Sequence, residues 1–288
     1  MSPVLQDFLS LLDLEQIEAN LFRGQSRNLG GKSVFGGQVL GQSLVAATRT
    51  VDPDRVPTSL HAYFLRPGDM AAPIVYDVEH SRDGGSFTWR RVKAIQHGKQ
   101  IFSMMAQFQA PEPGLTHQAP MPDVPPPEAL ATQAELREQW KDDCPSSLRK
   151  YFTRELAIEF KPVQPRNPFK PEPTRPEQCI WFKAAGALPD DAHLHQCVLT
   201  YASDFNLVTT ALLPHGVHYT TESMIVASLD HALWFHQPAK ADDWLLYVMD
   251  SPGAQGARGL SRGSIFSRDG TLIASVAQEG LMRDTRHG

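Results

Sequence analysis

The chain has few cysteines, no surplus of basic residues and no long apolar run. Its three cysteines, Cys144, Cys179 and Cys197, are far apart and odd in number, so they predict neither a disulfide framework nor a zinc site and are typical of a reducing compartment. A formal net charge of −5 argues against a general nucleic-acid binder, because such a protein needs cations to neutralise phosphates. No apolar run is long enough to cross a bilayer.

Neither end of the sequence carries a recognisable address. The first 22 residues lack the cationic start and apolar core of a secretory signal, and the last six, Arg-Asp-Thr-Arg-His-Gly, do not match a peroxisomal signal. We therefore expect a cytoplasmic protein. Its 288 residues are enough to bury a substantial core and to form two domains.

The first third of the chain has the pattern of one helix followed by four strands. Residues 35–51 predict a helix entered through Gly36 and Gly37, a pair that either permits close packing or cradles a phosphate. Because the strand connections are short, we expect an antiparallel meander. A short amphipathic helix over residues 4–13 and a strand over Ala19–Gln25 precede this unit. The four predicted strands are Pro57–Arg66, Pro73–Arg82, Ser86–His97 and Gln100–Gln109.

The same order of elements returns near the C-terminus. It follows a proline-rich stretch from Ala110 to about Pro176 that we interpret as a surface connection, with a helix over residues 129–151 and a strand over residues 156–160. The second unit is predicted to have a strand over Gln178–Ala185 and a helix over Leu194–Leu212. Its four further strands are Ser223–His236, Trp244–Pro252, Gly256–Arg268 and Thr271–Met282, the last two joined by a hairpin turn.

Shared letters indicate that the two units arose by duplication. The matching segments are Ser59-Leu60 with Ser228-Leu229, Phe64–Pro67 with Phe235–Pro238, and Met105–Gln107 with Val276–Gln278. The sequence thus predicts an α+β protein in which each unit combines an antiparallel sheet with a buried helix. We expect the first unit over residues 1–110, the proline-rich connection over 111–150 and the second unit over 151–288.

One carboxylate lies on the apolar stripe of the second long helix. Asp204 follows Tyr201 by three residues and precedes Val208 by four, and both neighbours belong to the apolar face. A carboxylate in apolar surroundings is costly unless it is hydrogen-bonded or paired. Asp204 therefore either caps a turn, pairs with an arginine or takes part in chemistry.

The two units differ in this reactive group. Residues 27–51 contain no Asp or Glu, so the first helix has no counterpart of Asp204. The second unit has Asp204 on its helix, Ser228 on the next strand and Gln278 on the last strand. Such a set can hold one water molecule, with Asp204 accepting its proton while Ser228 and Gln278 orient it. General-base help of this kind is typically worth about 10²–10⁴-fold in rate.

Ser228 is also a candidate nucleophile, but a serine nucleophile needs an adjacent base, usually histidine. Strand alternation predicts that His231 faces away from Ser228 and that His236 lies on the same face, several residues along. We therefore favour an oriented water over an acyl-serine. Taken alone, Ser228 and Gln278 are equally explained as strand residues hydrogen-bonded to the backbone.

Seven segments spread over both units resemble acyl-CoA thioesterase II. The resemblance implies a double hotdog fold, in which each sheet wraps around a long helix and the two sheets join side by side. It also implies hydrolysis of medium- to long-chain acyl-CoA to fatty acid and CoA, without metal or organic cofactor, by a homodimer or homotetramer. The segments are FRGQS (Phe22–Ser26), VFGGQVLGQSL (Val34–Leu44), HAYFLRPGD (His61–Asp69), SFTWRRV (Ser86–Val92), YASD (Tyr201–Asp204), DHALWFH (Asp230–His236) and QEGLMR (Gln278–Arg283).

The family's catalytic residues fall on three positions of this chain. Its Asp falls on Asp204, its Gln on Gln278, and its hydroxyl residue, Thr in some members and Ser in others, on Ser228. Where Thr is the family residue, Ser228 keeps the hydroxyl but loses the methyl group that stiffens χ1. The oxyanion formed during hydrolysis also needs donors, usually backbone N–H groups, which the sequence does not identify.

Other residues and other functions stay open. His61 is a second candidate base, although it lies in the unit without the carboxylate. Five arginines are candidates for the CoA phosphates: Arg82, Arg90, Arg91, Arg258 and Arg262. A hydratase or dehydratase of acyl thioesters is an alternative, but it needs an Asp–His pair, and His195 is upstream and off the apolar stripe. A non-catalytic acyl-CoA sensor is the third class.

Overall fold

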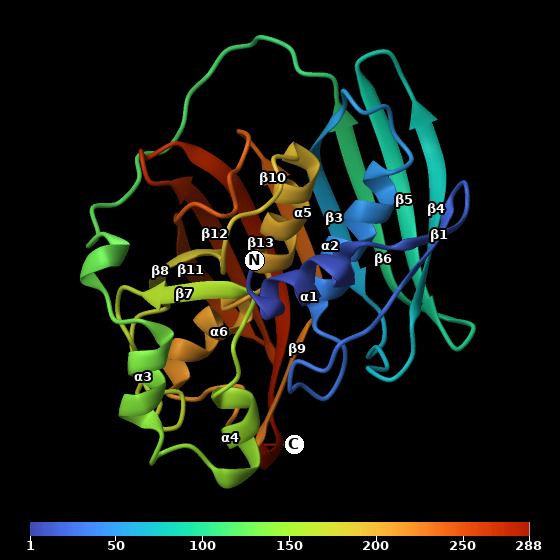
Figure 1. The fold of residues 1–288 in the computed structure, drawn as a ribbon. Helices are drawn as coiled ribbons and strands as arrows, with labels where there is room; N and C mark the ends of the chain where they lie inside the picture. Colours follow the sequence, from blue (N-terminus) through green and yellow to red (C-terminus); the bar gives the residue numbers. More distant parts are fainter. Residues whose placement is uncertain (288) are drawn as a thin grey trace.

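The computed structural model describes residues 1–287, in which thirteen strands form a single antiparallel sheet (Figure 1). The strands before the proline-rich connection are β1 (Glu15–Glu18), β2 (Leu21–Gly24), β3 (Val56–Phe64), β4 (Ile74–Asp83), β5 (Phe87–Gln96) and β6 (Lys99–Gln109). Those after it are β7 (Ile158–Pro162), β8 (Glu177–Ala184), β9 (Met224–Ser228), β10 (Asp230–Phe235), β11 (Leu245–Gln255), β12 (Arg258–Ser267) and β13 (Leu272–Asp284). Neighbours run in the order β1-β2-β4-β5-β6-β3-β10-β13-β12-β11-β8-β7, and β9 also pairs with β13. One side of the sheet, β1 to β6, is therefore built from the chain before the proline-rich connection, and the other side, β7 to β13, from the chain after it.

The two long helices lie against each other on one face of the sheet. α2 (Gly36–Thr48) packs on β2 to β6, α5 (Ala192–Ser203) packs on α2, and α6 (Leu207–Leu212) packs on β9 and β11 to β13. α1 (Pro3–Leu12) crosses α2, and Figure 1 shows α2 and α5 side by side in front of the sheet. The connection holds α3 (Gln133–Trp140) and α4 (Ser146–Phe152), and short 3-10 turns occur at η1 (Pro127–Ala129), η2 (Leu213–His215) and η3 (Thr285–His287). Between β6 and η1 the chain arches over the top of the molecule in the view of Figure 1.

The predicted α+β class is confirmed, and most predicted elements lie within a few residues of those observed. One exception is the helix predicted over residues 129–151, which is split into η1, α3 and α4. Pro145 is the N-cap of α4. Because proline has no N–H and restricts the residue before it, it favours a helix start over a helix interior.

The expected meander of four consecutive strands is wrong at its first step. β4, β5 and β6 follow one another in the sheet, but β3 pairs with β6 and β10 and not with β4. At the end of β3 the N–H groups of Leu65 and Arg66 both donate to the carbonyl of Ile101. β3 thus lies at the centre of the sheet, where its register with β10 joins the two ends of the chain.

One of the three matched segments occupies equivalent places on the two sides of the sheet. In the first half Phe64 pairs with Phe102, and in the second half Phe235 pairs with Ala274. After Phe235, the N–H groups of His236 and Gln237 both donate to the carbonyl of Ile273, as those of Leu65 and Arg66 do to Ile101. The match of Phe64–Pro67 with Phe235–Pro238 is therefore confirmed.

The other two matches are wrong in register. Leu60 lies four residues before Phe64 on β3, and His231 lies four residues before Phe235, so Leu60 takes the place of His231 on the buried face. Ala106, which pairs with Leu60, takes the place of Gln278. Gln107, the predicted counterpart of Gln278, lies next to Ala106 on the other face of β6, where its Oε1 accepts a hydrogen bond of 2.9 Å from Thr58. The buried polar groups of the second half are thus replaced by apolar side chains in the first.

A helix that crosses a membrane must be long and continuously apolar. None of the helices in residues 1–287 meets that requirement.

Candidate active site

Asp204 lies at a break between two helices, and not within the continuous helix predicted over Leu194–Leu212. α5 ends at Ser203, and Asn206 adopts a left-handed conformation (φ 64°) before α6 begins at Leu207. Asn tolerates this conformation better than most residues. The carbonyl of Asn206 accepts hydrogen bonds from Gln178 and Thr210, so the break is satisfied internally. Periodicity alone did not reveal the break, because the apolar spacing continues through it.

The Asp204 side chain is 4% exposed, and its carboxylate accepts hydrogen bonds from three elements. Its Oδ1 accepts from Gln278 Nε2 of β13 at 2.7 Å and from Ser228 Oγ at the end of β9 at 3.3 Å. Its Oδ2 accepts from the backbone N–H of Gly37, at the start of α2, at 2.8 Å. The structure therefore brings all three sequence-predicted site residues together. It adds a fourth group from the other half of the chain.

The two glycines at the start of α2 permit this approach. A Cβ at Gly36 would lie 2.8 Å from Asp204 Oδ2, and a Cβ at Gly37 would lie 2.4 Å from the carbonyl oxygen of Tyr201. Of the two roles that the sequence left open, close packing is the one these distances support. The helix start also directs its N–H groups and the positive end of its dipole at the carboxylate, which favours the ionised form.

A β-bulge between β9 and β10 changes which side chains face Asp204. Ser228 pairs with Gly280, but Ala232 pairs with Ala277, so three residues lie opposite two. The N–H of Glu279, displaced from the ladder, donates to the carboxylate of Asp230 at 2.7 Å. An inserted residue reverses the alternation of all residues beyond it.

The bulge makes the predicted orientation of the two histidines wrong. His231 is fully buried on the same face as Ser228, with Nε2 2.9 Å from Ser203 Oγ and Nδ1 4.0 Å from Asp204 Oδ1. His236 is on the opposite face, exposed, with Nε2 2.9 Å from Ser275 Oγ. His231 is therefore the residue near Asp204 that sequence reasoning missed. The DHALWFH segment contains His231, but its letters do not show the bulge that turns His231 toward Asp204.

Burial and hydrogen bonding shift the pKa of Asp204 in opposite directions. Burial raises the pKa of its carboxyl above the usual value, and the bonds from Gln278, Gly37 and Ser228 oppose that rise. Burial lowers the pKa of His231 to about 3, so the ring is neutral. The site thus contains a carboxylate with raised basicity beside a neutral imidazole, which is suited to taking a proton from a bound molecule.

His61, the other candidate base, does not lie at this site. It is exposed on the outer face of β3, and its ring lies 5.2 Å from that of Trp234 in an edge-on contact. On β3 it is the neighbouring residue, Leu60, that faces the interior.

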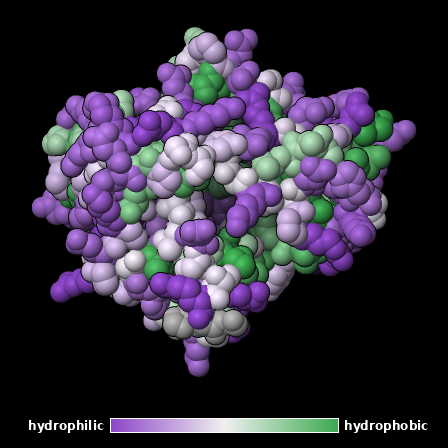
Figure 2. Space-filling view, turned by 90° about the horizontal axis from the view of Figure 1, so that it is seen from below, coloured by the Kyte–Doolittle hydropathy of each residue, from purple (hydrophilic) through white to green (hydrophobic). Residues whose placement is uncertain are grey.

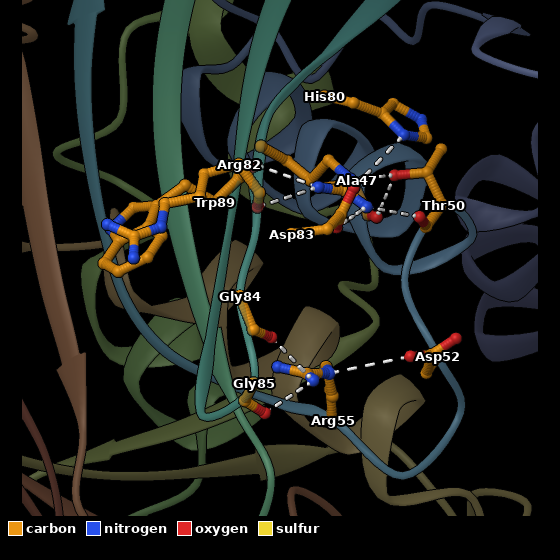
Figure 3. Close-up of polar contacts among 11 residues, drawn as sticks. Ala47, Thr50, Asp52, Arg55, His80, Arg82, Asp83, Gly84, Gly85 and Trp89 are labelled. Carbon is orange, nitrogen blue, oxygen red and sulfur yellow. Dashed lines mark hydrogen bonds and ion pairs between the residues drawn. The ribbon is translucent and has the colours of Figure 1, made fainter.

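Arg90, one of the arginines proposed for phosphate contact, is occupied within the protein. Figure 3 labels its partners Thr50, Arg82, Asp83 and Trp89. Its side chain is 3% exposed and forms an ion pair of 2.6 Å with Asp83. The guanidinium also donates to the hydroxyl and carbonyl of Thr50 and to the carbonyls of Arg82 and Trp89. Arg90 therefore anchors the end of α2 to the β4–β5 hairpin and is not available to a ligand.

The four other arginines are at the surface. The guanidinium of Arg82 is exposed and lies 5.4 Å from the centre of the Trp89 ring (Figure 3). The remaining three form ion pairs with acidic residues of neighbouring strands, namely Arg91 with Glu79, Arg258 with Glu279 and Arg262 with Asp250.

The lower face of the molecule, in the orientation of Figure 1, is hollowed (Figure 2). Figure 2, a view from below Figure 1, shows a recess near the centre of this face, edged by both hydrophilic and hydrophobic residues. A separate cavity of about 470 Å³ lies at the other end of the α2–α5 pair, where Val45, Leu194 and Cys197 are among the lining residues. Asp204, Ser228 and Gln278 do not line that cavity.

Comparisons with known proteins agree with this geometry. A family model described as acyl-CoA thioesterase matches residues 147–281, and one described as the acyl-CoA thioesterase N-terminal domain matches residues 25–109. Acyl-CoA thioesterase 2 of Haemophilus influenzae is 44% identical over 283 residues, which are 98% of this chain and 99% of that protein.

Solved structures give the same relation. An acyl-CoA thioesterase II from Mycobacterium marinum has 44% identity and a TM-score of 0.78, covering 96% of this chain and 97% of that one. A protein of unknown function with a hotdog fold from Alicyclobacillus acidocaldarius, 20% identical, has a TM-score of 0.76 and covers 96% and 98% of the two chains. The fold is therefore a hotdog fold. With this identity over nearly its whole length, the chain belongs to the acyl-CoA thioesterase II family of thioester hydrolases.

Proposed function

We propose that this protein hydrolyses medium- to long-chain acyl-CoA to free fatty acid and CoA, using a water molecule oriented by Asp204, Ser228 and Gln278. The observation that carries the proposal is the buried carboxylate whose Oδ1 accepts from both an amide and a hydroxyl. The names of the relatives supply the substrate class. Gln278 adds support, because its Oε1 is buried without a hydrogen-bond partner among the described residues and is free to accept from water.

In this mechanism Asp204 accepts a proton as the water oxygen attacks the thioester carbonyl. The tetrahedral oxyanion then collapses, the carbon–sulfur bond breaks, and the leaving CoA thiolate takes the proton from Asp204. Burial favours the step, since it raises the proton affinity of the carboxylate. The positive end of α2 is directed at the Asp204 carboxylate through the Gly37 N–H, and it favours the ionised form that accepts the proton.

Direct attack by Ser228 is the less supported route. Its hydroxyl lies 3.3 Å from Asp204 Oδ1, and the nearby histidine, His231, makes its hydrogen bond to Ser203 instead. An acyl-serine would be detected by mass spectrometry as an acyl adduct on Ser228 after quenching during turnover. We expect no such adduct.

The activity is tested by mixing purified protein with decanoyl-CoA or palmitoyl-CoA and a thiol reagent. We expect CoA release that falls by at least about 10²-fold in Asp204→Asn, and a series of chain lengths then gives the preference. Tight binding without turnover would identify an acyl-CoA sensor. Unchanged turnover in Asp204→Asn would refute the proposal that Asp204 is the general base.

A hydratase acting on acyl thioesters is a second candidate, because His231 and Asp204 are 4.0 Å apart. Against it, His231 is fully buried and its Nε2 faces Ser203, so the ring does not reach a substrate. Hydration of crotonyl-CoA, followed at the absorbance of its double bond, distinguishes the two activities. We expect none.

We also propose a double hotdog organisation, with units over residues 1–110 and 151–288 joined by the connection over 111–150. The order of strands and the pairing of β3 with β10 support it. Cytoplasmic location and self-association remain part of the proposal. Tyr63 and Trp234, which are 61% and 37% exposed on the outer face of the sheet, are consistent with a further contact surface. Light scattering coupled to size-exclusion chromatography tests the oligomer.

A further inference from the structure

His231 has two ring nitrogens in different situations. Nε2 lies 2.9 Å from Ser203 Oγ. Nδ1 is buried, has no hydrogen-bond partner among the described residues and lies 4.0 Å from Asp204 Oδ1. A buried polar atom without a partner is rare and calls for an explanation.

The other half of the chain shows what packing alone requires at this position. The place equivalent to His231 is taken by Leu60, which is also fully buried. An apolar side chain therefore suffices to fill this position, and packing alone does not require an imidazole. The imidazole occurs only in the half of the chain that carries Asp204. We therefore relate His231 to the carboxylate and not to the packing of the sheet.

We propose that His231 is a positioning residue that keeps Asp204 ionised, by holding its single proton on Nδ1, facing Asp204 Oδ1, while Nε2 accepts from the Ser203 hydroxyl. This inference rests on the proposed function, since it concerns the base of that reaction. It assigns no contact with the substrate to His231.

The Ser203 hydroxyl allows the ring to exist in either tautomer. Its Oγ lies 2.9 Å from both His231 Nε2 and the carbonyl oxygen of Thr200. If the hydroxyl donates to Thr200, the ring must donate through Nε2, and a lone pair then faces the carboxylate. If the hydroxyl turns to Nε2, the Nδ1 proton faces the carboxylate instead. A negative charge on Asp204 favours the second arrangement.

The ring acts as a dipole and not as a cation. Burial holds the pKa of His231 near 3, so it stays neutral while Asp204 changes its protonation. The other titratable groups facing Asp204 are Tyr201 of α5 and Tyr247 of β11, and burial raises the pKa of both phenols. Gly37, Ser228 and Gln278, which contact the carboxylate from α2, β9 and β13, do not titrate. Among residues 1–286 no lysine or arginine forms an ion pair with Asp204, so the dipole of His231 adds to those of the fixed donors.

Two substitutions separate the two nitrogens. His231→Asn keeps a donor near the position of Nδ1 but loses the contact with Ser203, whereas His231→Gln reaches Ser203 but has no donor at the Nδ1 position. A third, His231→Leu, copies Leu60 and reports on packing, with the melting temperature as its measure. The kinetic readout is the pH at which kcat/KM for decanoyl-CoA falls on the acid side.

We expect the acid limb of His231→Asn to stay close to that of the wild type. In His231→Gln and His231→Leu it should move to higher pH by about one unit, so that kcat/KM on the acid side falls about tenfold. His231→Leu should keep a melting temperature close to that of the wild type, as Leu60 fits the equivalent position. Equal limbs in His231→Asn and His231→Gln would overturn the proposal.

Infrared spectroscopy gives a readout that does not depend on turnover. The carboxyl band of Asp204, isolated by subtracting the spectrum of Asp204→Asn, should titrate at higher pH in His231→Gln than in the wild type. If the wild type does not hydrolyse acyl-CoA, the proposed function fails but this titration still tests His231. A titration unchanged by His231→Gln would refute the inference even in an active enzyme.

Discussion

Replacing Gly37 by alanine tests the contact between the two halves of the chain at the site. The added Cβ would lie 2.4 Å from the carbonyl oxygen of Tyr201 and as close to the ring of Phe35. Since the carbonyl belongs to the backbone of α5, the helices must move apart by about 1 Å to reach an ordinary contact. Such overpacking typically costs about 1–3 kcal/mol, and the better helix propensity of alanine offsets less than about 1 kcal/mol.

We therefore expect Gly37→Ala to lower the free energy of unfolding by about 2 kcal/mol, which for a chain of 288 residues corresponds to a fall of roughly 3 °C in melting temperature. The same shift moves the Gly37 N–H away from Asp204 Oδ2, and a hydrogen bond to a charged group is worth about 1.5–3 kcal/mol. The pKa of Asp204 should rise further, and the acid limb of activity should move to higher pH.

Gly41→Ala is the matched control for this change. It lies one helical turn along α2, and a Cβ there would be 3.3 Å from Leu12 and from the Tyr201 side chain, with no atom closer. We expect a small change in melting temperature and an unchanged acid limb. Differential scanning calorimetry and the pH profile of CoA release check both variants. A Gly37→Ala protein as stable and as active as the wild type would refute the close approach of α2 to α5.

Three further predictions concern the carboxylate, its amide partner and the buried arginine. Because burial raises the pKa of Asp204 in the folded protein, folding disfavours its ionised form, and the cost is present above the raised pKa and absent below the usual value of 3.8. Asp204→Asn should therefore melt at a higher temperature than the wild type at pH 8, and the difference should shrink as the pH falls through the raised pKa towards 3.8; calorimetry that finds no dependence on pH would contradict this. Gln278→Leu should lower kcat by about 10²-fold, as expected for loss of an orienting group, and should lower the free energy of unfolding by about 1.5–3 kcal/mol, because the buried Asp204 carboxylate loses a donor; a change confined to KM in steady-state assays would argue against its role. Arg90→Met should lower the free energy of unfolding by about 2–4 kcal/mol, since it leaves three part-buried carbonyls without this donor, without changing kcat; denaturant unfolding that finds no loss would contradict the anchoring role.

Most of the sheet was predictable, because its strands carry their own signals. The segments around β4, β5 and β6 have alternating apolar residues and end at Asp83-Gly84-Gly85 or His97-Gly98, where a positive φ is needed at His97 and Gly98. The position of β3 was not predictable in the same way. Its place beside β6 and β10 depends on pairing between segments distant in the sequence.

The site was predictable in its residues but not in its geometry. Asp204, Ser228 and Gln278 are close together in the structure, although the helix carrying Asp204 is broken and the match that led to Gln278 is out of register. The bulge before His231 changes the facing of a strand by one inserted residue, and no local propensity marks it. The contribution of Gly37 required the two helices to be placed against each other, which only tertiary packing decides.

The hydrogen bond from Gly37 to Asp204 means that the first half of the chain, whose helix α2 carries no carboxylate, still supplies a donor to the candidate site. The C-terminal portion, produced without residues 1–110, would lack this donor and the surface on which α5 rests. Co-expression of two fragments would have to rebuild the β3–β10 seam before any turnover returned. A chain shortened to its C-terminal half would therefore keep Asp204 but lose the Gly37 N–H that donates to it.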